Sequence, residues 1–364
     1  MNKINIFVFS IMMLLGGSLL AKDWTESLKI RGDFRYRHEM IDQEDKDTRN
    51  RHRIRARIDL IGTVNEETKV VVGISSGSTD PVSNNQTLTD AFSSKGLLID
   101  KAYVEYSPKA APGLMLTAGK MYNPFYKPAE SELVWDSDIR QEGIRAEYQA
   151  NTENVTLQFI GSSLWIEERK DDDDSYLAAG QVIFGCDLKD SDVDFAGGAS
   201  YFYYGNTRGF AAFYDDEDSF GNSVDVNGMY ANDYELLELF GTVSFKVNEN
   251  VPVTLLGDFV TNTAADSLKS AWLVGVRVGK TKNPGSWDFR YNYREVKKDA
   301  VLGIFTDSDF RGGGTDAKGH EIGFSYQLLD KTTFAATYFI NEIGLEKEAS
   351  TDFNRLQLDL KFKF

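Results

Sequence analysis

Apolar and polar residues alternate along most of the chain after residue 22. The last twelve residues, "FNRLQLDLKFKF", place an apolar side chain at every second position from Leu356 to Phe364. Because successive side chains of a β-strand point to opposite faces, this spacing predicts strands with one apolar face and one polar face. Helical periodicity is nearly absent over the same residues, so we expect an all-β fold.

About sixteen segments alternate in this way, each over roughly nine to twelve residues, the length that a tilted strand needs to cross a bilayer. Their connections also alternate, between short turns such as "NEET" and long polar loops such as residues 205–232. Short periplasmic turns and long extracellular loops predict a transmembrane antiparallel β-barrel of about 16 strands, wide enough to hold an aqueous channel. The predicted strands are residues 27–40, 51–64, 69–78, 97–106, 114–121, 142–150, 154–163, 176–186, 193–204, 233–247, 251–261, 270–280, 286–297, 318–328, 332–341 and 353–364.

The first residues predict export from the cytoplasm. Residues 1–21, "MNKINIFVFSIMMLLGGSLLA", combine a basic start, an apolar run and a small final residue, as a secretory signal peptide does. An N-terminal membrane anchor is the alternative. We therefore expect a cleaved signal peptide over residues 1–21, one barrel domain over residues 22–364, and a location in the cell outer membrane. Cys186 is the only cysteine, so no intramolecular disulfide is expected.

The charge of the whole chain differs from the charge expected inside the barrel. The formal net charge is -16, which excludes nucleic acid as a partner because phosphate binding needs a basic footprint. Much of the acid falls in long loops, at residues 167–176 ("EERKDDDDSY"), 215–219 ("DDEDS") and 307–309 ("DSD"). We therefore expect an acidic outer mouth above a bore whose strands carry more basic than acidic side chains.

Counting from Arg49, an arginine occupies every second position as far as Arg57, at the start of the stretch "NRHRIRARIDLIG" (residues 50–62). In a barrel the apolar face of this strand meets lipid, so the arginines face the water-filled lumen, and the preceding strand adds a second basic row. Walls of arginine and lysine favour the passage of anions. The predicted basic wall consists of Lys29, Arg31, Arg35, Arg37, Arg51, Arg53, Arg55 and Arg57, and the other charges expected in the lumen are Arg145, Arg290, Arg294 and Arg355.

One long connection differs from the others in composition. Residues 121–142, "MYNPFYKPAESELVWDSDIRQE", combine prolines, aromatic residues and carboxylates. We expect this loop to fold into the bore, with Glu130, Glu132, Asp136 and Asp138 facing the arginine wall across a constriction. The alternative is a surface loop that packs on the rim. The candidate constriction residues are Tyr122, Phe125, Glu130, Glu132, Asp136 and Asp138.

Residues 27–150 resemble the putative porin family of Gram-negative outer membranes. The likeness rests on "KIRGDFRYRHE", "NRHRIRARIDLIG", "VGISSGSTDPVSNNQTL", "DKAYVEYSP", "LTAGKMYNPF" and "LVWDSDIRQEGI". The final aromatic strand, ending in Phe364, also resembles the signal read by the outer-membrane assembly machinery. The resemblance implies a channel of sixteen or a similar number of strands and leaves a homotrimer open. It implies no particular solute.

Together these features predict an outer-membrane porin that allows passive diffusion of small hydrophilic solutes, with a mild preference for anions. No enzyme activity, catalytic residue, metal or cofactor is expected. The expected partners are outer-membrane lipid and lipopolysaccharide, together with small solutes and ions. One alternative is a substrate-selective porin that holds an anion such as phosphate. Another is a surface barrel whose loops bind external partners.

Two smaller signals leave further alternatives open. His52 and His320 fall on outward faces near the loop end, where a polar-tipped ring at the lipid headgroups explains them. The alternatives there are a metal ligand and a serine hydrolase site, but no neighbouring strand offers a convincing serine. The run "DDDDS" within residues 167–176 is expected to be a solvated loop, with divalent cation binding as the alternative.

Overall fold

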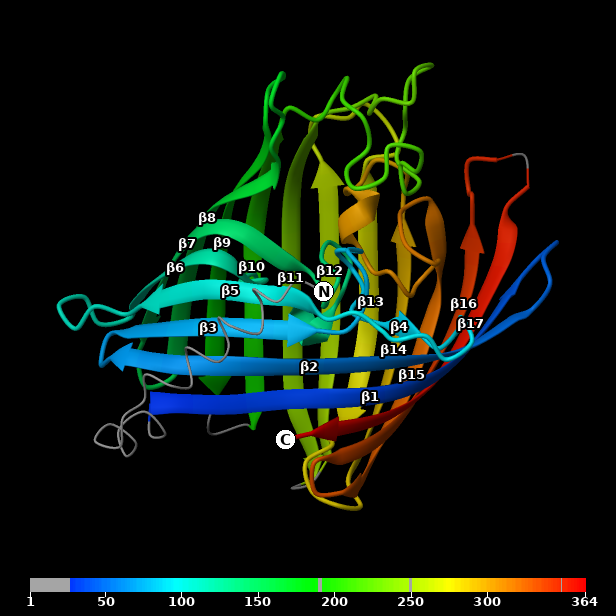
Figure 1. The fold of residues 1–364 in the computed structure, drawn as a ribbon. Coiled ribbons are helices and arrows are strands. Elements are labelled where there is room, and N and C mark those ends of the chain that lie inside the picture. The colour runs from blue at the N-terminus through cyan, green and yellow to red at the C-terminus, as the bar shows by residue number, and fades with distance from the viewer. Residues whose placement is uncertain (1–26, 189–191, 249–250, 348) are drawn as a thin grey trace, which may run out of the picture.

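A single closed barrel accounts for nearly all of the secondary structure (Figure 1). The computed structural model describes residues 27–188, 192–248, 251–347 and 349–364, so the predicted signal peptide lies outside the described residues. Strand β1 pairs with both β2 and β17, and this pairing of the first and last strands closes the sheet. Closure leaves no unpaired edge of the kind that hydrocarbon does not tolerate.

The barrel wall has sixteen antiparallel strands, as the alternation predicted, and each pairs with its neighbours in sequence. A two-residue strand, β4 (Gln86–Thr87), lies in a loop and pairs with β2. The wall strands are β1 (Leu28–Gln43), β2 (Arg49–Asn65), β3 (Thr68–Ser75), β5 (Leu98–Tyr106), β6 (Leu114–Tyr122), β7 (Arg140–Asn151), β8 (Val155–Glu167), β9 (Ser175–Leu188), β10 (Val193–Gly205), β11 (Tyr234–Asn248), β12 (Val251–Asn262), β13 (Ser270–Gly279), β14 (Trp287–Val296), β15 (Ala317–Leu329), β16 (Thr332–Ile343) and β17 (Thr351–Lys363).

Side chains sort onto the two faces of the wall as the alternation requires. On β1, Phe34 and Tyr36 are exposed on the outer face, whereas Arg35 and Arg37 are buried inside. The same division holds around the barrel, where exposed large apolar residues occupy the outer positions of most strands. This outer surface suits contact with lipid, which is the physical reason why only half of each strand is apolar.

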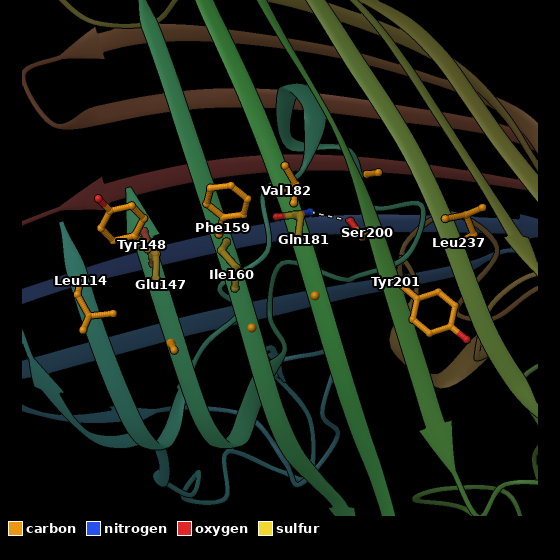
Figure 2. A pocket seen from close by; sticks show the side chains of 14 residues that line it. Leu114, Glu147, Tyr148, Phe159, Ile160, Gln181, Val182, Ser200, Tyr201 and Leu237 are labelled. Carbon is orange, nitrogen blue, oxygen red and sulfur yellow. Dashed lines mark hydrogen bonds between the residues drawn. The ribbon is translucent and has the colours of Figure 1, made fainter. Parts of the chain in front are cut away.

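Figure 2 gives a close view of the side chains that line a groove across strands β6 to β11. Their outward residues, among them Tyr148, Phe159 and Tyr201, form a shallow apolar groove of about 560 Å³. On the inward side of the same strands, the Gln181 side-chain amide donates to the Ser200 hydroxyl at 2.9 Å. Successive residues of these strands therefore face opposite sides of the wall, one toward the apolar outer surface and the next toward the hydrogen-bonded interior.

The two ends of the barrel differ in their connections. Turns such as residues 66–67 and 330–331 join strands at one end, where the chain also finishes (Figure 1). Long connections, among them residues 76–97, 123–139, 206–233 and 297–316, join strands at the other end. The wall is also uneven, because β3, β5 and β6 have only 8, 9 and 9 residues whereas β1 and β2 have 16 and 17.

Three of the long loops pack inside the barrel instead of standing in solvent. Leu133 and Trp135 of loop 123–139, Tyr230 of loop 206–233 and Leu302 of loop 297–316 belong to one buried cluster with Phe202 of β10. The sequence predicted inward folding for residues 121–142 alone and indicated only polar loops for the other long connections, so the inward packing of 206–233 and 297–316 was not predicted. Their apolar residues avoid water by packing on one another within the barrel.

In the described ranges, no helix is both long enough and apolar enough to span a membrane.

Candidate pore and its constriction

Loop 123–139 crosses the interior of the barrel. It contains a short 3-10 helix, η1 (Pro128–Glu130), and hydrogen bonds hold it on the far wall. The backbone N–H of Tyr126 donates to Gln181 Oε1 of β9 at 2.7 Å, and the Ser131 hydroxyl donates to Asp258 Oδ2 of β12 at 2.9 Å. The loop leaves β6 and reaches β9 and β12, so it narrows the space between the walls.

Asp138 brings the end of this loop back to the arginines of β2. Its Oδ1 accepts from Arg55 Nη1 at 3.3 Å and from Arg57 Nη1 at 3.2 Å. The same two arginines bind Asp33 of β1, at 2.9 Å and 2.7 Å. Burial opposes ionisation of Asp138, but Arg55 and Arg57 outweigh it and lower its pKa to about 2. Asp138 is therefore an anion at neutral pH, and these two arginines are already paired.

Of the four acidic residues expected to face the arginine wall, Asp138 alone does so. Glu130 instead pairs with Arg277 of β13, at 2.9 Å. Asp136 turns away because its Oδ1 accepts the backbone N–H of Asp138 at 2.7 Å, which folds its side chain back on its own loop. Glu132 and Asp136 lie beside Asp307 of loop 297–316, with one carboxylate oxygen of each within 4.8 Å of the others.

Loop 297–316 supplies two carboxylates that the sequence interpretation placed wrongly at a solvated mouth. Asp307 lies 2.7 Å from Arg294 of β14, and Asp309 pairs with Arg37 at 3.1 Å and with Arg355 at 2.8 Å. In the sequence, residues 307–309 ("DSD") look the same as an acidic segment exposed to solvent, so no local signal indicates that they are buried. Their position follows from the packing of loop 297–316 beneath loop 123–139, which is a contact between segments far apart in the sequence.

The two aromatic constriction candidates, Tyr122 and Phe125, are held by contacts with neighbouring side chains. Tyr122 ends β6, and its hydroxyl donates to Asp59 Oδ2 at 2.8 Å while it accepts from Lys101 Nζ at 2.7 Å. Phe125 packs edge-on against Phe202, with ring centroids 5.0 Å apart, inside the buried apolar cluster. Among the expected lumen charges, Arg145 points inward but is buried against β6, where it donates to Thr117 Oγ1 at 3.1 Å.

Three polar cavities follow one another along the bore, and we name them the outer, central and inner chambers. Their volumes are about 200, 490 and 760 Å³. The outer and central chambers share Asp309, and the central and inner chambers share Arg55, Arg57, Lys361 and Lys363, so they adjoin. All eight residues of the predicted basic wall line these chambers. Arg51 and Arg53 line the outer chamber, Arg35, Arg37, Arg55 and Arg57 line the central chamber, and Lys29 and Arg31 line the inner chamber. Of the other charges expected in the lumen, Arg355 lines the outer chamber, and Arg290 and Arg294 line the central chamber.

The chambers differ in charge balance. Ten basic and seven acidic side chains line the central chamber, where the carboxylates of loops 123–139 and 297–316 meet the arginines. Three acidic side chains (Asp33, Asp59 and Glu105) line the inner chamber, against nine basic ones: Lys29, Arg31, Arg55, Arg57, Lys69, Lys101, Lys331, Lys361 and Lys363. The surplus of positive charge is therefore largest at the short-turn end, beyond the arginines that the sequence highlights.

Glu132 should make ion selectivity depend on pH. Burial, and then the nearby Asp307, raise the pKa of Glu132 from 4.5 to about 7, so it gains its charge as the pH rises through neutrality. Because Glu132 lines the central chamber, the preference for anions that the sequence predicts should weaken between roughly pH 6 and pH 8. A raised carboxyl pKa also means that the protonated form stabilises the fold, so this stabilisation is complete below 4.5 and is lost as the pH rises through about 7.

Reversal potentials measured in a salt gradient at several pH values check this expectation. Glu132→Gln should remove the transition near neutral pH. Glu130→Gln is the matched control, since Glu130 is in the same loop but pairs with Arg277, and it should retain the transition. An unchanged pH profile in Glu132→Gln would contradict the assignment.

Comparison with known proteins places these features in context. A family model described as "Putative porin" matches residues 40–215 and 211–364. In fold, the chain is similar to Pseudomonas putida OprB, with a TM-score of 0.62 at 9% identity, covering 93% of this chain and 95% of that one. It is also similar to a loop-deletion mutant of Vibrio cholerae OmpT, an outer membrane protein, with a TM-score of 0.51 at 13% identity, covering 93% and 100%. A search of curated proteins finds no match.

Proposed function

Because the chain belongs to the putative porin family, we propose that its barrel is a passive diffusion channel of the outer membrane for small hydrophilic solutes, with a mild preference for anions. The observation that carries the proposal is the row of three adjoining polar chambers inside a wall whose outer face is apolar. A solute gradient drives transport, and loop 123–139 sets the size limit.

The preference for anions rests on the inner chamber more than on the arginine wall. At the constriction, Arg55 and Arg57 are paired with Asp33 and Asp138, so their charges are largely compensated there. The inner chamber has nine basic side chains against three acidic ones, and basic linings favour anions electrostatically. The preference should therefore be mild and should decrease with added salt, since screening shortens the reach of each charge.

Insertion of the purified barrel into planar bilayers tests the channel. We expect stepwise currents that rise linearly with voltage at low voltage, and a reversal potential of anion-selective sign in a salt gradient. The mature chain should fractionate with outer-membrane lipid and lipopolysaccharide after removal of residues 1–21, which N-terminal sequencing of the exported protein would detect. A barrel that gives no current would overturn the proposal.

We also propose that the barrel forms a homotrimer through its shortest strands. Strands β3, β5 and β6 have 8, 9 and 9 residues. Ile99 of β5, and Phe92 and Leu97 of the loop before it, have exposed apolar side chains. Burial of such side chains against a neighbouring copy would remove apolar surface from water. Phe92→Asp should shift the detergent-extracted protein from trimer to monomer in light scattering, whereas Leu188→Asp, an exposed position at the end of β9 and away from these strands, should not.

A further inference from the structure

We infer that the inner chamber is a binding site for small multivalent anions, such as organic phosphates or di- and tricarboxylates, and that they enter it from the short-turn side. This inference rests on the proposed channel function and names a solute class for it. The site is distinct from the constriction, because the cations that define it belong to the inner end of the bore.

Strands from both sides of the closure build the chamber. Lys29 and Arg31 come from β1, Lys69 from β3, and Lys363 from β17. Lys331, in the turn before β16, lies beside Lys363, because the Lys363 backbone N–H donates to its carbonyl at 3.0 Å. Pairing of β1 with both β2 and β17 therefore gathers cations from the two ends of the chain at one place.

These five cations have no ion pair within 4.0 Å in the described parts of the chain, and two of the three acidic side chains that line the chamber are already engaged. Asp33 binds Arg55 and Arg57. Asp59 binds Lys101 at 2.8 Å and accepts from the Tyr122 hydroxyl. Glu105 stands opposite Lys69 across β3 and β5, but no ion pair joins them. Even with the C-terminal carboxylate of Phe364 counted, positive charge is in excess.

The arrangement favours an anion with two or more charges. In water a single pair of charges about 4 Å apart gains only about 1 kcal/mol, which salt weakens further, so a chloride ion is held weakly. An anion that reaches several ammonium groups at once gains from each of them. Lysine suits this role because its ammonium is a mobile point charge that adapts to phosphate or carboxylate geometry.

The rest of the chamber is consistent with a small organic body. Ile61, Val71 and Tyr103 contribute apolar surface among the cations, and the volume of about 760 Å³ exceeds that of a bare ion. Toward the loops the path meets Arg55 and Arg57, which Asp33 and Asp138 already hold. A multivalent anion therefore reaches the five unpaired cations most easily from the short-turn side.

Block of the chloride current tests the inference, with pyrophosphate and citrate as separate probes at constant ionic strength. We expect either probe to reduce the current from one side of the bilayer only. The triple variant Lys29→Gln, Lys331→Gln and Lys363→Gln should raise the half-blocking concentration at least about tenfold. The matched control, Lys280→Gln with Lys282→Gln, removes charge from a turn at the same end of the barrel that does not line the chamber. Its half-blocking concentrations should equal those of the unaltered barrel.

The outcomes separate the inference from the proposed function. Block by pyrophosphate but not by citrate would restrict the solute class to phosphates, and the converse to carboxylates. Equal block from both sides, no block at millimolar probe, or block unaltered in the triple variant would overturn the inference while leaving the channel intact. If the barrel gave no current, the channel proposal would fail. Calorimetric titration of pyrophosphate into the detergent-solubilised barrel and its triple variant would then decide whether the site binds.

Discussion

Replacing Arg55 and Arg57 by alanine is expected to weaken the proposed preference of the bore for anions. The double variant leaves Asp33 and Asp138 without their arginine partners, at the place where loop 123–139 narrows the bore. Two positive charges are lost, which lowers the positive potential that favours anions at this place. The ratio of anion to cation permeability should fall roughly threefold, which corresponds to about 0.6 kcal/mol. Reversal potentials in a potassium chloride gradient measure this ratio.

The conservative double variant, Arg55→Lys with Arg57→Lys, keeps both charges but loses the forked geometry of the guanidinium groups. It should retain the sign of the selectivity. Lys280→Ala with Lys282→Ala removes the same charge from an exposed turn outside the chambers and should leave selectivity unaltered. If the alanine variant kept the full anion preference of the unaltered barrel, these two arginines would contribute nothing to selectivity, and the other cations of the inner chamber would have to set it alone.

Replacing residues 128–136 with a short Gly/Ser linker is expected to raise single-channel conductance about twofold or more, because a barrel of sixteen strands has a wide lumen when no loop fills it. The segment includes η1, which stands against β11 and β12, and Leu133 and Trp135, which anchor the buried cluster. Without these anchors, loops 206–233 and 297–316 lose packing partners inside the barrel. We therefore also expect noisier open-channel current.

A point substitution separates the anchoring of the loop from its bulk. Trp135→Ala removes a side chain that is 3% exposed, and substitutions of this kind cost about 3–5 kcal/mol in a packed core. It should increase current noise with a smaller gain in mean conductance. Shortening the exposed loop 168–174 is the matched control and should alter neither quantity. Unchanged conductance in the linker variant would show that another segment limits the current.

Local patterning was enough to predict the wall of the barrel. Alternation at every second residue placed Arg35 and Arg37 inside and Phe34 and Tyr36 outside, because a strand leaves each side chain only two directions. The same rule located the eight residues of the basic wall on the lumen side. Strand ends were less certain: the segment expected at residues 69–78 is β3, Thr68–Ser75, and β4 was missed because two residues carry no periodicity.

The interior of the bore could not be predicted in the same way. Asp136 and Asp138 have the same charge and lie two residues apart, yet one faces Asp307 and the other faces Arg55 and Arg57. A loop has no fixed period, so sequence spacing does not assign its side chains to a face. The positions of Asp307 and Asp309 depend on how loops 123–139 and 297–316 pack together, and that contact has no local signal.

Spacing within single strands was enough to specify the lipid-facing and water-facing sides of the wall and the row of arginines, since each follows from residues that are neighbours in one strand. Which charges remain available to a solute depends on the folded arrangement of the whole chain. That outcome depends on ion pairs between distant segments, which compensate the conspicuous arginines and leave Lys29, Arg31, Lys69, Lys331 and Lys363 without an ion pair among the described residues. Charge compensation is a matter of distances in space, and the order of residues along a chain does not specify these.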